Sequence, residues 1–309
     1  MRQKLNLAQI RKSGSMPARF KRERLLIIGC GDVGLRVIKA LPQRVRVVVL
    51  TSNAMRCEEF RALGVTPIVG NLDQPASLSR LAGLASRIIN LAPPPLSGVK
   101  DPRTLALTRA LRRRSLPKSL VYGSTSGVYG DCQGRRIKES QTISAQTPRA
   151  KRRVEAEACV RFLGRSSGVR VGVLRIPGIY ANDRVGGTPK DRLLMGLPLL
   201  ETGDDVYTNH IHADDLARAC WIGLWRCLPQ RTYNINDDSE LKMGDYFDLA
   251  ADLLMLPRSP RVSRSIAQEK MSLIQMSFMS ESRRMDNNRM KKELRLTLAY
   301  PNVQCGLAN

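Results

Sequence analysis

Three glycines near the start of the regular part of the chain have the spacing of a phosphate-binding turn. They stand in GCGDVG (29–34), where the apolar run LLIIG (25–29) ends. In such a turn the first glycine permits a tight bend, the second lets the backbone approach a pyrophosphate, and the third lets helix and strand pack closely. The free N–H groups that begin the next helix then bind the phosphates. The motif predicts a dinucleotide site, for NAD or NADP, formed by Gly29, Gly31, Asp32, Val33 and Gly34.

The end of the second predicted strand favours NADP over NAD. NAD sites carry an acidic residue roughly 20 residues after the glycine motif, which binds the ribose 2′-hydroxyl. Here the strand ends in LTSN (50–53), and no Asp or Glu occurs between it and Glu58. The hydroxyl of Ser52 and the guanidinium of Arg56 suit a 2′-phosphate better.

Strands and helices alternate from residue 24 to about residue 180. We predict strands at 25–29, 44–50, 65–70, 86–92, 119–124 and 169–177, with helices at 33–41, 57–64, 75–83, 101–115 and 148–167. This alternation predicts an α/β fold with a doubly wound parallel sheet, the Rossmann fold. Such sheets bind ligands at the carboxyl ends of their strands.

The alternation breaks down after Gly178. We predict helices at 189–196, 213–228, 242–255 and 285–294, and one strand at 233–236. The chain therefore divides into a disordered basic arm (1–23), an NAD(P)-binding Rossmann domain (24–180) and a smaller C-terminal α/β substrate lobe (181–309). We expect the lobe to pack on the same sheet and to be partly interleaved with it.

Further short motifs stand near the ends of the later strands. They are NL (71–72), NLA (90–92), STSGVYG (124–130), RIPGIY (175–180) and NHIHADD (209–215). In this order they resemble the extended short-chain dehydrogenase/reductase superfamily, in its NAD-dependent epimerase/dehydratase branch. The resemblance implies that Asn71 and Leu72 lie near the adenine, and Pro177 near the nicotinamide amide. It also implies that Leu91, Ala92 and Pro93 lie along the cofactor.

The chain departs from that superfamily at the residues that transfer protons. The family uses a Ser or Thr after the fifth strand, matched here by Thr125, and a Tyr-x-x-x-Lys pair on the next helix. None of the seven tyrosines has a lysine four residues later, and the helix places Arg149 and Arg153 at the two positions. An arginine keeps its proton because its pKa exceeds about 12, so Arg149 cannot act as a base, whereas Arg153 could hold the ribose. The chain resembles an atypical member that uses another group or has lost the reaction.

Four side chains are candidates for the missing proton-transfer role. Tyr129, Tyr180 and Tyr207 are predicted in loops at the carboxyl edge of the sheet, and His210 has an ordinary pKa suited to proton transfer. A structural role is the alternative for His210, and it is also the alternative for Thr125. We assign Thr125, Arg153 and Tyr129 as candidate catalytic residues, and Tyr180, Tyr207 and His210 as candidate substrate-binding residues.

The net charge of +24 predicts attraction to anions. Phosphorylated substrates, nucleic acid and acidic lipid surfaces all fit, and a general bias toward arginine explains the charge equally well. The basic runs at 109–114 and 149–153 contain no aromatic residue on which a base could stack, so nucleic-acid binding ranks below catalysis.

The cysteines and histidines predict no metal site. The seven cysteines form no CxxC pair, and the two histidines lack a nearby cluster of ligands, so we expect reduced thiols in a cytoplasmic protein without zinc. No apolar run reaches the roughly 20 residues that cross a bilayer. The superfamily resemblance also implies a homodimer.

Two functions follow from these observations. The first is an NAD(P)-dependent oxidoreductase or epimerase/dehydratase-like enzyme that acts on a small substrate, phosphorylated or nucleotide-linked. The second is a catalytically degenerate NAD(P)-binding sensor or assembly factor, which the two arginines favour.

Overall fold

The computed structural model of the chain describes residues 23–42, 44–271, 276–277 and 279–308. Except for Glu23, the basic arm expected at 1–23 lies outside the described residues. No helix within the described ranges is both long enough and apolar enough to cross a membrane. Each of the seven cysteines has a free thiol.

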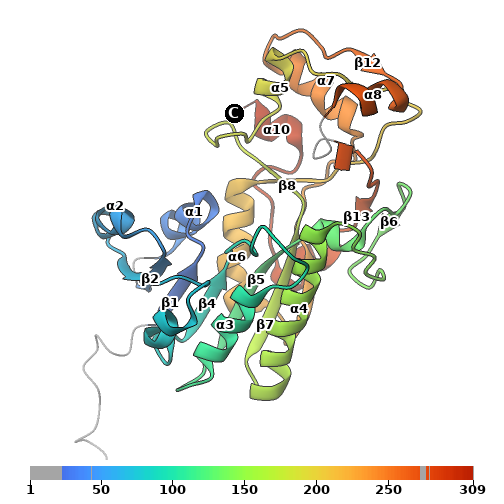
Figure 1. The fold of residues 1–309 in the computed structure, drawn as a ribbon. Coiled ribbons are helices and arrows are strands. Elements are labelled where there is room, and N and C mark those ends of the chain that lie inside the picture. Colours follow the sequence, from blue (N-terminus) through green and yellow to red (C-terminus); the bar gives the residue numbers. More distant parts are fainter. Residues whose placement is uncertain (1–22, 43, 272–275, 278, 309) are drawn as a thin grey trace, which may run out of the picture.

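Seven parallel strands form the central sheet (Figure 1), in the order β11-β7-β5-β4-β1-β2-β3. This confirms the predicted doubly wound α/β fold. The chain runs outward from β1 to β3 and then returns to β4 on the other side of β1, so the strand order reverses between β1 and β4. Such a reversal leaves a crevice at the carboxyl ends of the strands. The strands are β1 (Arg24–Ile28), β2 (Arg46–Thr51), β3 (Thr66–Val69), β4 (Arg87–Asn90), β5 (Ser119–Thr125), β7 (Arg170–Ile176) and β11 (Arg231–Asn234).

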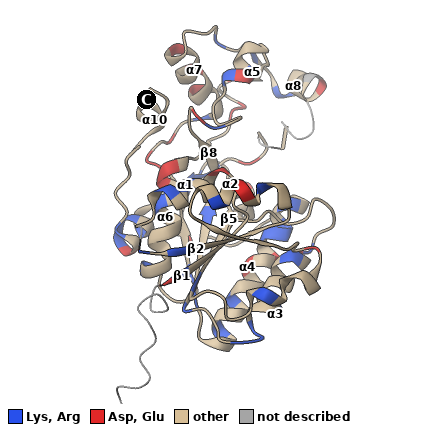
Figure 2. Cartoon of the chain, turned by 90° about the vertical axis from the view of Figure 1, so that its left-hand side faces the viewer, with Lys and Arg blue, Asp and Glu red and all other residues tan. Residues whose placement is uncertain are grey.

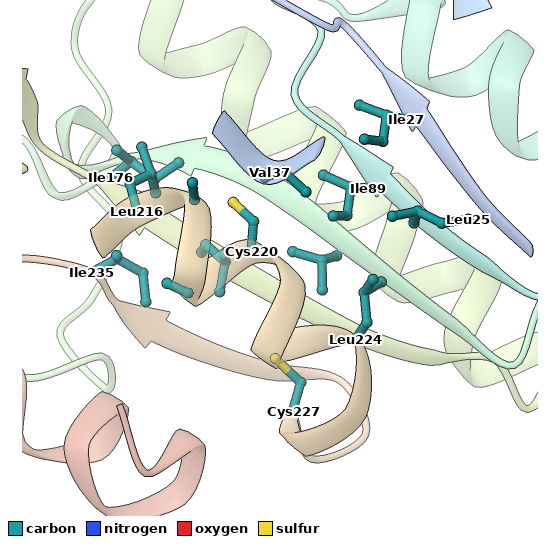
Figure 3. Packing of buried hydrophobic residues seen from close by; sticks show 14 of the residues in the cluster. Leu25, Ile27, Val37, Ile89, Ile176, Leu216, Cys220, Leu224, Cys227 and Ile235 are labelled. Carbon is teal, nitrogen blue, oxygen red and sulfur yellow. The ribbon is translucent and has the colours of Figure 1, made fainter. Parts of the chain in front are cut away.

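Helices cover both faces of this sheet, which is why its strands are almost continuously apolar. Along β1, Leu25 and Ile27 point into the core under one face, while Leu26 and Ile28 point into the core under the other. The first face carries α1 (Asp32–Ala40), α2 (Cys57–Ala62) and α6 (Ala213–Arg226). Figure 3 shows Val37 of α1 and Leu216, Cys220 and Leu224 of α6 facing the strand residues of this core. The second face carries the 3-10 helix η3 (Pro75–Leu81), α3 (Pro102–Leu111) and α4 (Pro148–Ser167).

The C-terminal lobe lies beyond the carboxyl edge of the sheet (Figure 1) and has a core of its own. It is built mostly from short elements. These are β8 (Gly178–Tyr180), α5 (Lys190–Leu194), β9 (Leu199–Leu200), β10 (His210–His212), α7 (Met243–Leu253), β12 (Arg261–Val262), α8 (Arg264–Lys270) and α10 (Val303–Leu307). Strand β8 pairs with β10, and β9 pairs with β12.

Beyond residue 180, helix α6 and strand β11 belong to the layers of the central sheet, with β11 as its edge strand. The helix expected at 285–294 is wrong at its start, because Arg284–Met285 forms β13 and pairs with β6 (Arg136–Ile137). Residues 288–294 are helical, with π-type geometry over Met290–Leu294. The Met285 N–H donates to Asn209 Oδ1, a contact between distant segments that local periodicity does not report.

Candidate functional site

The glycine turn between β1 and α1 has room for a ligand beside one of its three glycines. Gly29 has a φ of +78°, and a Cβ there would lie 2.3 Å from the backbone nitrogen of Ala92. A Cβ on Gly34 would lie 2.9 Å from Cys30 Sγ, so this glycine lets helix and strand pack closely. A Cβ on Gly31 would meet nothing within 4 Å, although it stands at the N-terminus of α1. The open space therefore lies where the N–H groups of the helix would meet a pyrophosphate.

A groove of about 430 Å³ continues from this turn along the ends of β1, β2, β3 and β4. It brings together most of the residues that the sequence predicted for the cofactor: Gly29, Gly31, Ser52, Arg56, Asn71, Leu72, Leu91, Ala92 and Pro93. Val33 and Gly34 belong to the helix behind the turn rather than to the groove lining. The lining combines backbone amides, apolar side chains and two arginines, which fits the adenosine half of a dinucleotide.

Arg56 and Arg103 are the two arginines of the groove, and each is paired with one carboxylate. Arg56 binds Glu59 through Nε and Nη2, both at 2.9 Å, and donates from Nη1 to the Cys30 carbonyl at 2.9 Å. Its guanidinium also lies 4.6 Å from the centre of the Phe60 ring. Arg103 binds Asp73 through two nitrogens and the Pro93 carbonyl through the third. Sequence reasoning missed Arg103, whose only signal was its place in a basic helix.

Asp32 lies in an ion-pair network instead of the groove. Its carboxylate accepts from Arg36 at 3.0 Å and from Arg184 at 2.5 Å. Arg36 also binds Asp183, in the loop after β8, and Asp214, at the start of α6. The network ties the start of α1 to the C-terminal lobe, so it positions the glycine turn relative to that lobe.

A second cavity, of about 380 Å³, lies between the carboxyl edge of the sheet and the lobe. We call it the central cavity. Its lining includes Thr125, Ser126, Thr147, Arg149, Arg153, Pro177, Gly178, Arg192, Tyr207, Asn209, His210, Met243, Glu281 and Arg283. Arg153 connects the two spaces, because it lines the central cavity and also donates to the carbonyl of Ala92, which lines the groove.

Arg149 and Arg153 both line the central cavity from the first turns of α4. Arg153 Nη1 lies 2.8 Å from the Gly123 carbonyl, 3.0 Å from the Tyr122 hydroxyl and 3.4 Å from the Ala92 carbonyl. The guanidinium is thus held by the strand ends of β4 and β5. Both positions supply a fixed positive charge and neither supplies a group that releases or accepts a proton at ordinary pH.

Thr125, a candidate catalytic residue from the sequence, lines the central cavity. Its Oγ1 accepts a hydrogen bond of 3.3 Å from the Gly127 N–H and so caps the short helix η4 (Ser126–Tyr129). This bond leaves the proton of the hydroxyl available for a ligand. The structural role and a role toward substrate are compatible in this geometry.

The structure corrects the expectation that Tyr129 and Tyr180 face the cleft. Tyr129 is fully buried, and its hydroxyl donates to Asn234 Oδ1 at 2.6 Å. Burial raises the pKa of Tyr129, and Arg175 lies 4.6 Å from the centre of its ring. Tyr180 is buried in the core of the lobe, where its hydroxyl donates to the Asn302 carbonyl and burial raises its pKa. Neither side chain lines the central cavity, because apolar packing holds each ring inside.

Tyr207 and His210 do line the central cavity. The Tyr207 ring is flanked by the guanidinium of Arg284 at 4.8 Å and the ammonium of Lys242 at 5.9 Å. The His210 ring lies 4.1 Å from that of Tyr246 and is only 7% exposed. Its Nδ1 has no hydrogen-bond partner among the described residues. Burial lowers the pKa of His210 to about 4, so the imidazole is neutral at neutral pH.

Sequence reasoning assigned no role to three charged residues of this cavity. Arg192 comes from α5, while Glu281 and Arg283 come from the segment before β13, where Glu281 Oε2 accepts from Arg283 Nη1 at 2.8 Å. They belong to no recognisable motif and lie far along the chain from β5. Across the ranges that the structure describes, no three His, Cys, Asp or Glu side chains gather in a group suited to a metal ion.

Comparison with known proteins agrees with the fold. The family model of the TrkA-N domain, a Rossmann NAD-binding domain, matches residues 25–89. No curated protein matches the chain. A conserved protein of unknown function from Silicibacter pomeroyi is 27% identical, with a TM-score of 0.77 over 92% of this chain and 96% of that one.

Two solved enzymes resemble the chain over similar lengths. A UDP-glucose 4-epimerase from Thermotoga maritima is 17% identical, with a TM-score of 0.73 over 92% of this chain and 96% of its own. A dTDP-glucose 4,6-dehydratase from Streptomyces venezuelae, solved with NAD bound, is 21% identical, with a TM-score of 0.74 over 92% and 94%. The chain has the epimerase/dehydratase fold. The resemblance found in the motifs is thus confirmed for the architecture that carries the groove and the central cavity.

Proposed function

We propose that the chain is an NAD(P)-dependent oxidoreductase or epimerase/dehydratase-like enzyme, with NADP preferred. We place the cofactor on residues 24–180 and the substrate against the lobe of residues 181–309. The observation that carries the proposal is the junction at Arg153, where the dinucleotide groove meets the central cavity. A cofactor lying along the groove would reach this cavity with its reactive end.

The lining residues define what the chain itself contributes to a reaction. A bound nicotinamide would supply or accept the hydride. Thr125 donates its free hydroxyl proton in a hydrogen bond to the reacting oxygen, and Arg149 and Arg153 stabilise negative charge that develops there. Among the described lining residues, Tyr207, His210 and Glu281 are the groups that can exchange a proton.

Cofactor binding is tested with Gly31→Glu. The position has an ordinary extended backbone with open space beside it, so the substitution leaves the fold intact and fills the space proposed for the pyrophosphate. We expect calorimetry to detect NADPH binding to the native chain and none to the variant, with equal unfolding temperatures. Equal NADPH affinity in both proteins, or none in the native chain, contradicts the proposal.

The preference for NADP rests on Ser52 and Arg56 at the end of β2. Arg56 would bind a 2′-phosphate beside its existing contact with Cys30. We expect Arg56→Gln to weaken NADPH binding about tenfold, equivalent to about 1.4 kcal/mol, and to leave NADH binding unchanged. Arg61→Gln, an exposed change in α2, which begins directly after Arg56, is the control.

A non-catalytic NAD(P)-binding protein is the second candidate, favoured by the two arginines in the cavity. The two candidate functions can be distinguished by turnover, because only the enzyme would oxidise NADPH in the presence of a substrate. We would follow NADPH oxidation spectroscopically over a panel of carbonyl compounds and nucleotide-sugars, with Thr125→Val as the variant. Turnover that Thr125→Val abolishes supports the enzyme, whereas tight NADPH binding without turnover on any substrate supports the sensor. We also propose a homodimer, which light scattering tests.

A further inference from the structure

We propose that the substrate of the central cavity is a compact molecule with a carboxylate or phosphate group, and that Arg192 and Arg283 bind this group. The inference rests on the proposed function, because it names the substrate class of the same site. Arg192 approaches from α5 of the lobe, and Arg283 approaches from the segment before β13, where it contacts Gly130 and Ser126. Thr125 and Arg153 approach from the sheet. The anionic group would therefore be held where the lobe meets the loop after β5, while the rest of the substrate meets the cofactor.

Arg192 is a half-buried cation whose charge is balanced by few hydrogen bonds from the described residues. Its Nε and Nη2 are buried and have no hydrogen-bond partner among the described residues. Its guanidinium lies 4.5 Å from the centre of the Phe247 ring, a contact with the ring face that leaves the hydrogen-bonding edge unused. Burial lowers the pKa of Arg192, yet the group stays charged. A buried charge without a partner is unfavourable, so an anionic ligand would remove a penalty present in the free protein.

Arg283 is the second cation proposed to bind the anionic group, and it is 9% exposed. Its Nη1 donates to the Gly130 carbonyl and to Glu281, and its Nη2 lies 3.4 Å from Ser126 Oγ. Its Nε is buried without a partner among the described residues. These contacts hold the guanidinium rigidly at the cavity wall and leave part of its donor capacity unused.

The charge of the cavity supports an anion rather than a neutral molecule. Its described lining carries four arginines against one glutamate, Glu281, and that glutamate is already bonded to Arg283. His210 adds no positive charge at neutral pH because burial keeps it neutral. Figure 2 shows basic residues on α4 and on α5, the helices that carry Arg149, Arg153 and Arg192 of the cavity lining. Guanidinium groups bind planar carboxylates and phosphates with two hydrogen bonds, which suits this arrangement.

The size of the cavity favours a compact substrate. The space of about 380 Å³ lies at the small end of ligand pockets and must also accept the reactive end of the cofactor. A small hydroxy or keto acid, or a small phosphorylated carbonyl compound, fits these requirements. A nucleoside-diphosphate sugar would have to extend well outside this space.

The test compares native protein, Arg192→Gln and Arg109→Gln, with NADPH present. Arg109 is an exposed arginine of α3 outside the cavity, so it controls for the general positive charge. The probes are malonate, inorganic phosphate and UDP-glucose, each against chloride of equal ionic strength. Binding is measured by calorimetry and by the shift in unfolding temperature.

We expect malonate or phosphate to bind native protein and Arg109→Gln equally, and to bind Arg192→Gln at least tenfold more weakly. The malonate and phosphate arms tell which oxyanion is preferred. Without any anion, Arg192→Gln should unfold at a temperature equal to or above that of the native chain, because the substitution removes an uncompensated charge. If Arg192 had a purely structural role, Arg192→Gln would unfold at a lower temperature than the native chain.

Three results would overturn the inference: no small anion binds the native chain, Arg192→Gln retains full affinity, or UDP-glucose binds tighter than both small anions. NADPH binding, measured separately, keeps this test distinct from that of the proposed function. If NADPH binds but Arg192→Gln does not change anion affinity, only the proposed anion subsite is wrong. If NADPH does not bind, the proposed function itself is wrong.

Discussion

The carbonyl oxygen of Gly123, at the carboxyl end of β5, accepts a hydrogen bond of 2.8 Å from Nη1 of Arg153. The same nitrogen reaches Ala92, just after β4, and the Tyr122 hydroxyl. Arg153, at the position where the superfamily that the chain resembles has lysine, is therefore a fixed part of the strand ends between the groove and the central cavity. Its charge is available to a ligand, and its proton is not.

Replacing Arg153 by Met should weaken both the fold and the cofactor site. The carbonyls of Gly123 and Ala92 would lose a charged donor, and we expect a loss of about 1–3 kcal/mol in the free energy of unfolding. NADPH affinity should fall roughly tenfold, or about 1.4 kcal/mol. Urea denaturation and calorimetry measure the two effects. Lys151→Met, an exposed change on the same helix, should stay within about 0.5 kcal/mol of the native chain, and a similar loss in both variants would contradict this role.

Replacing Gly29 by Ala should destabilise the protein more than replacing Gly64 by Ala. Both glycines have positive φ, +78° and +72°, so both substitutions strain the backbone by roughly 1 kcal/mol or more. Only at Gly29 would the new Cβ also collide with Ala92, and nothing lies within 4 Å of the position at Gly64. The difference in unfolding free energy isolates the close approach of the turn to β4. Equal losses would mean that this approach is not tight.

Asp237 should make the protein less stable as the pH rises from about 4 to about 7. Burial raises its pKa from 3.8 to about 7, and the Tyr180 hydroxyl, whose own proton goes to Asn302, faces the carboxyl. The folded chain keeps the proton while the unfolded chain loses it, so this stability is present below about pH 4 and is lost by about pH 7. Three pKa units correspond to about 4 kcal/mol.

Asp237→Asn keeps the size of the side chain and an oxygen that can accept from the Ser239 N–H, and it removes the titration. We expect the variant to be more stable than the native chain above pH 7, with the difference shrinking toward pH 4, as measured by urea midpoints over this range. Glu58→Gln, at an exposed acid of α2, should leave the pH profile unchanged. A native advantage at pH 8 would show that Asp237 is stabilised as a carboxylate.

His210 should produce a slope of the opposite sign in the same pH range. Burial lowers its pKa from 6.5 to about 4. Between these two pH values His210 is therefore protonated in the unfolded chain and neutral in the folded chain. Its contribution is present above pH 6.5 and is lost as the pH falls toward 4, by about 3 kcal/mol in total. In the Asp237→Asn background the opposing slope is gone, and adding His210→Gln should reduce the remaining slope. The part that persists is expected from His212, whose pKa burial also lowers. An unchanged slope in the double variant would assign it to other groups.

The sequence by itself determined the sheet, the glycine turn and helix α4. Strands buried on both faces must be almost continuously apolar, and this pattern is readable without knowing their partners. Helix α4 has the bounds predicted for it. Local residues set both ends in the structure: Thr147 caps the start, where its Oγ1 accepts from the Ala150 N–H, and Gly168 ends the helix in the left-handed conformation. The glycine motif was equally local, since its geometry involves a few consecutive residues and one neighbouring strand.

Only the tertiary structure decided which side chains enter the central cavity. Tyr129 and Tyr207 are both loop tyrosines in the sequence, yet packing buries the first and leaves the second at the cavity wall. Arg192 and Arg283 line the same cavity as Thr125, although the three residues lie far apart along the chain. Local patterns report backbone conformation and average burial. The direction of a polar side chain in a lobe of short elements depends on contacts between distant segments, which no periodicity records.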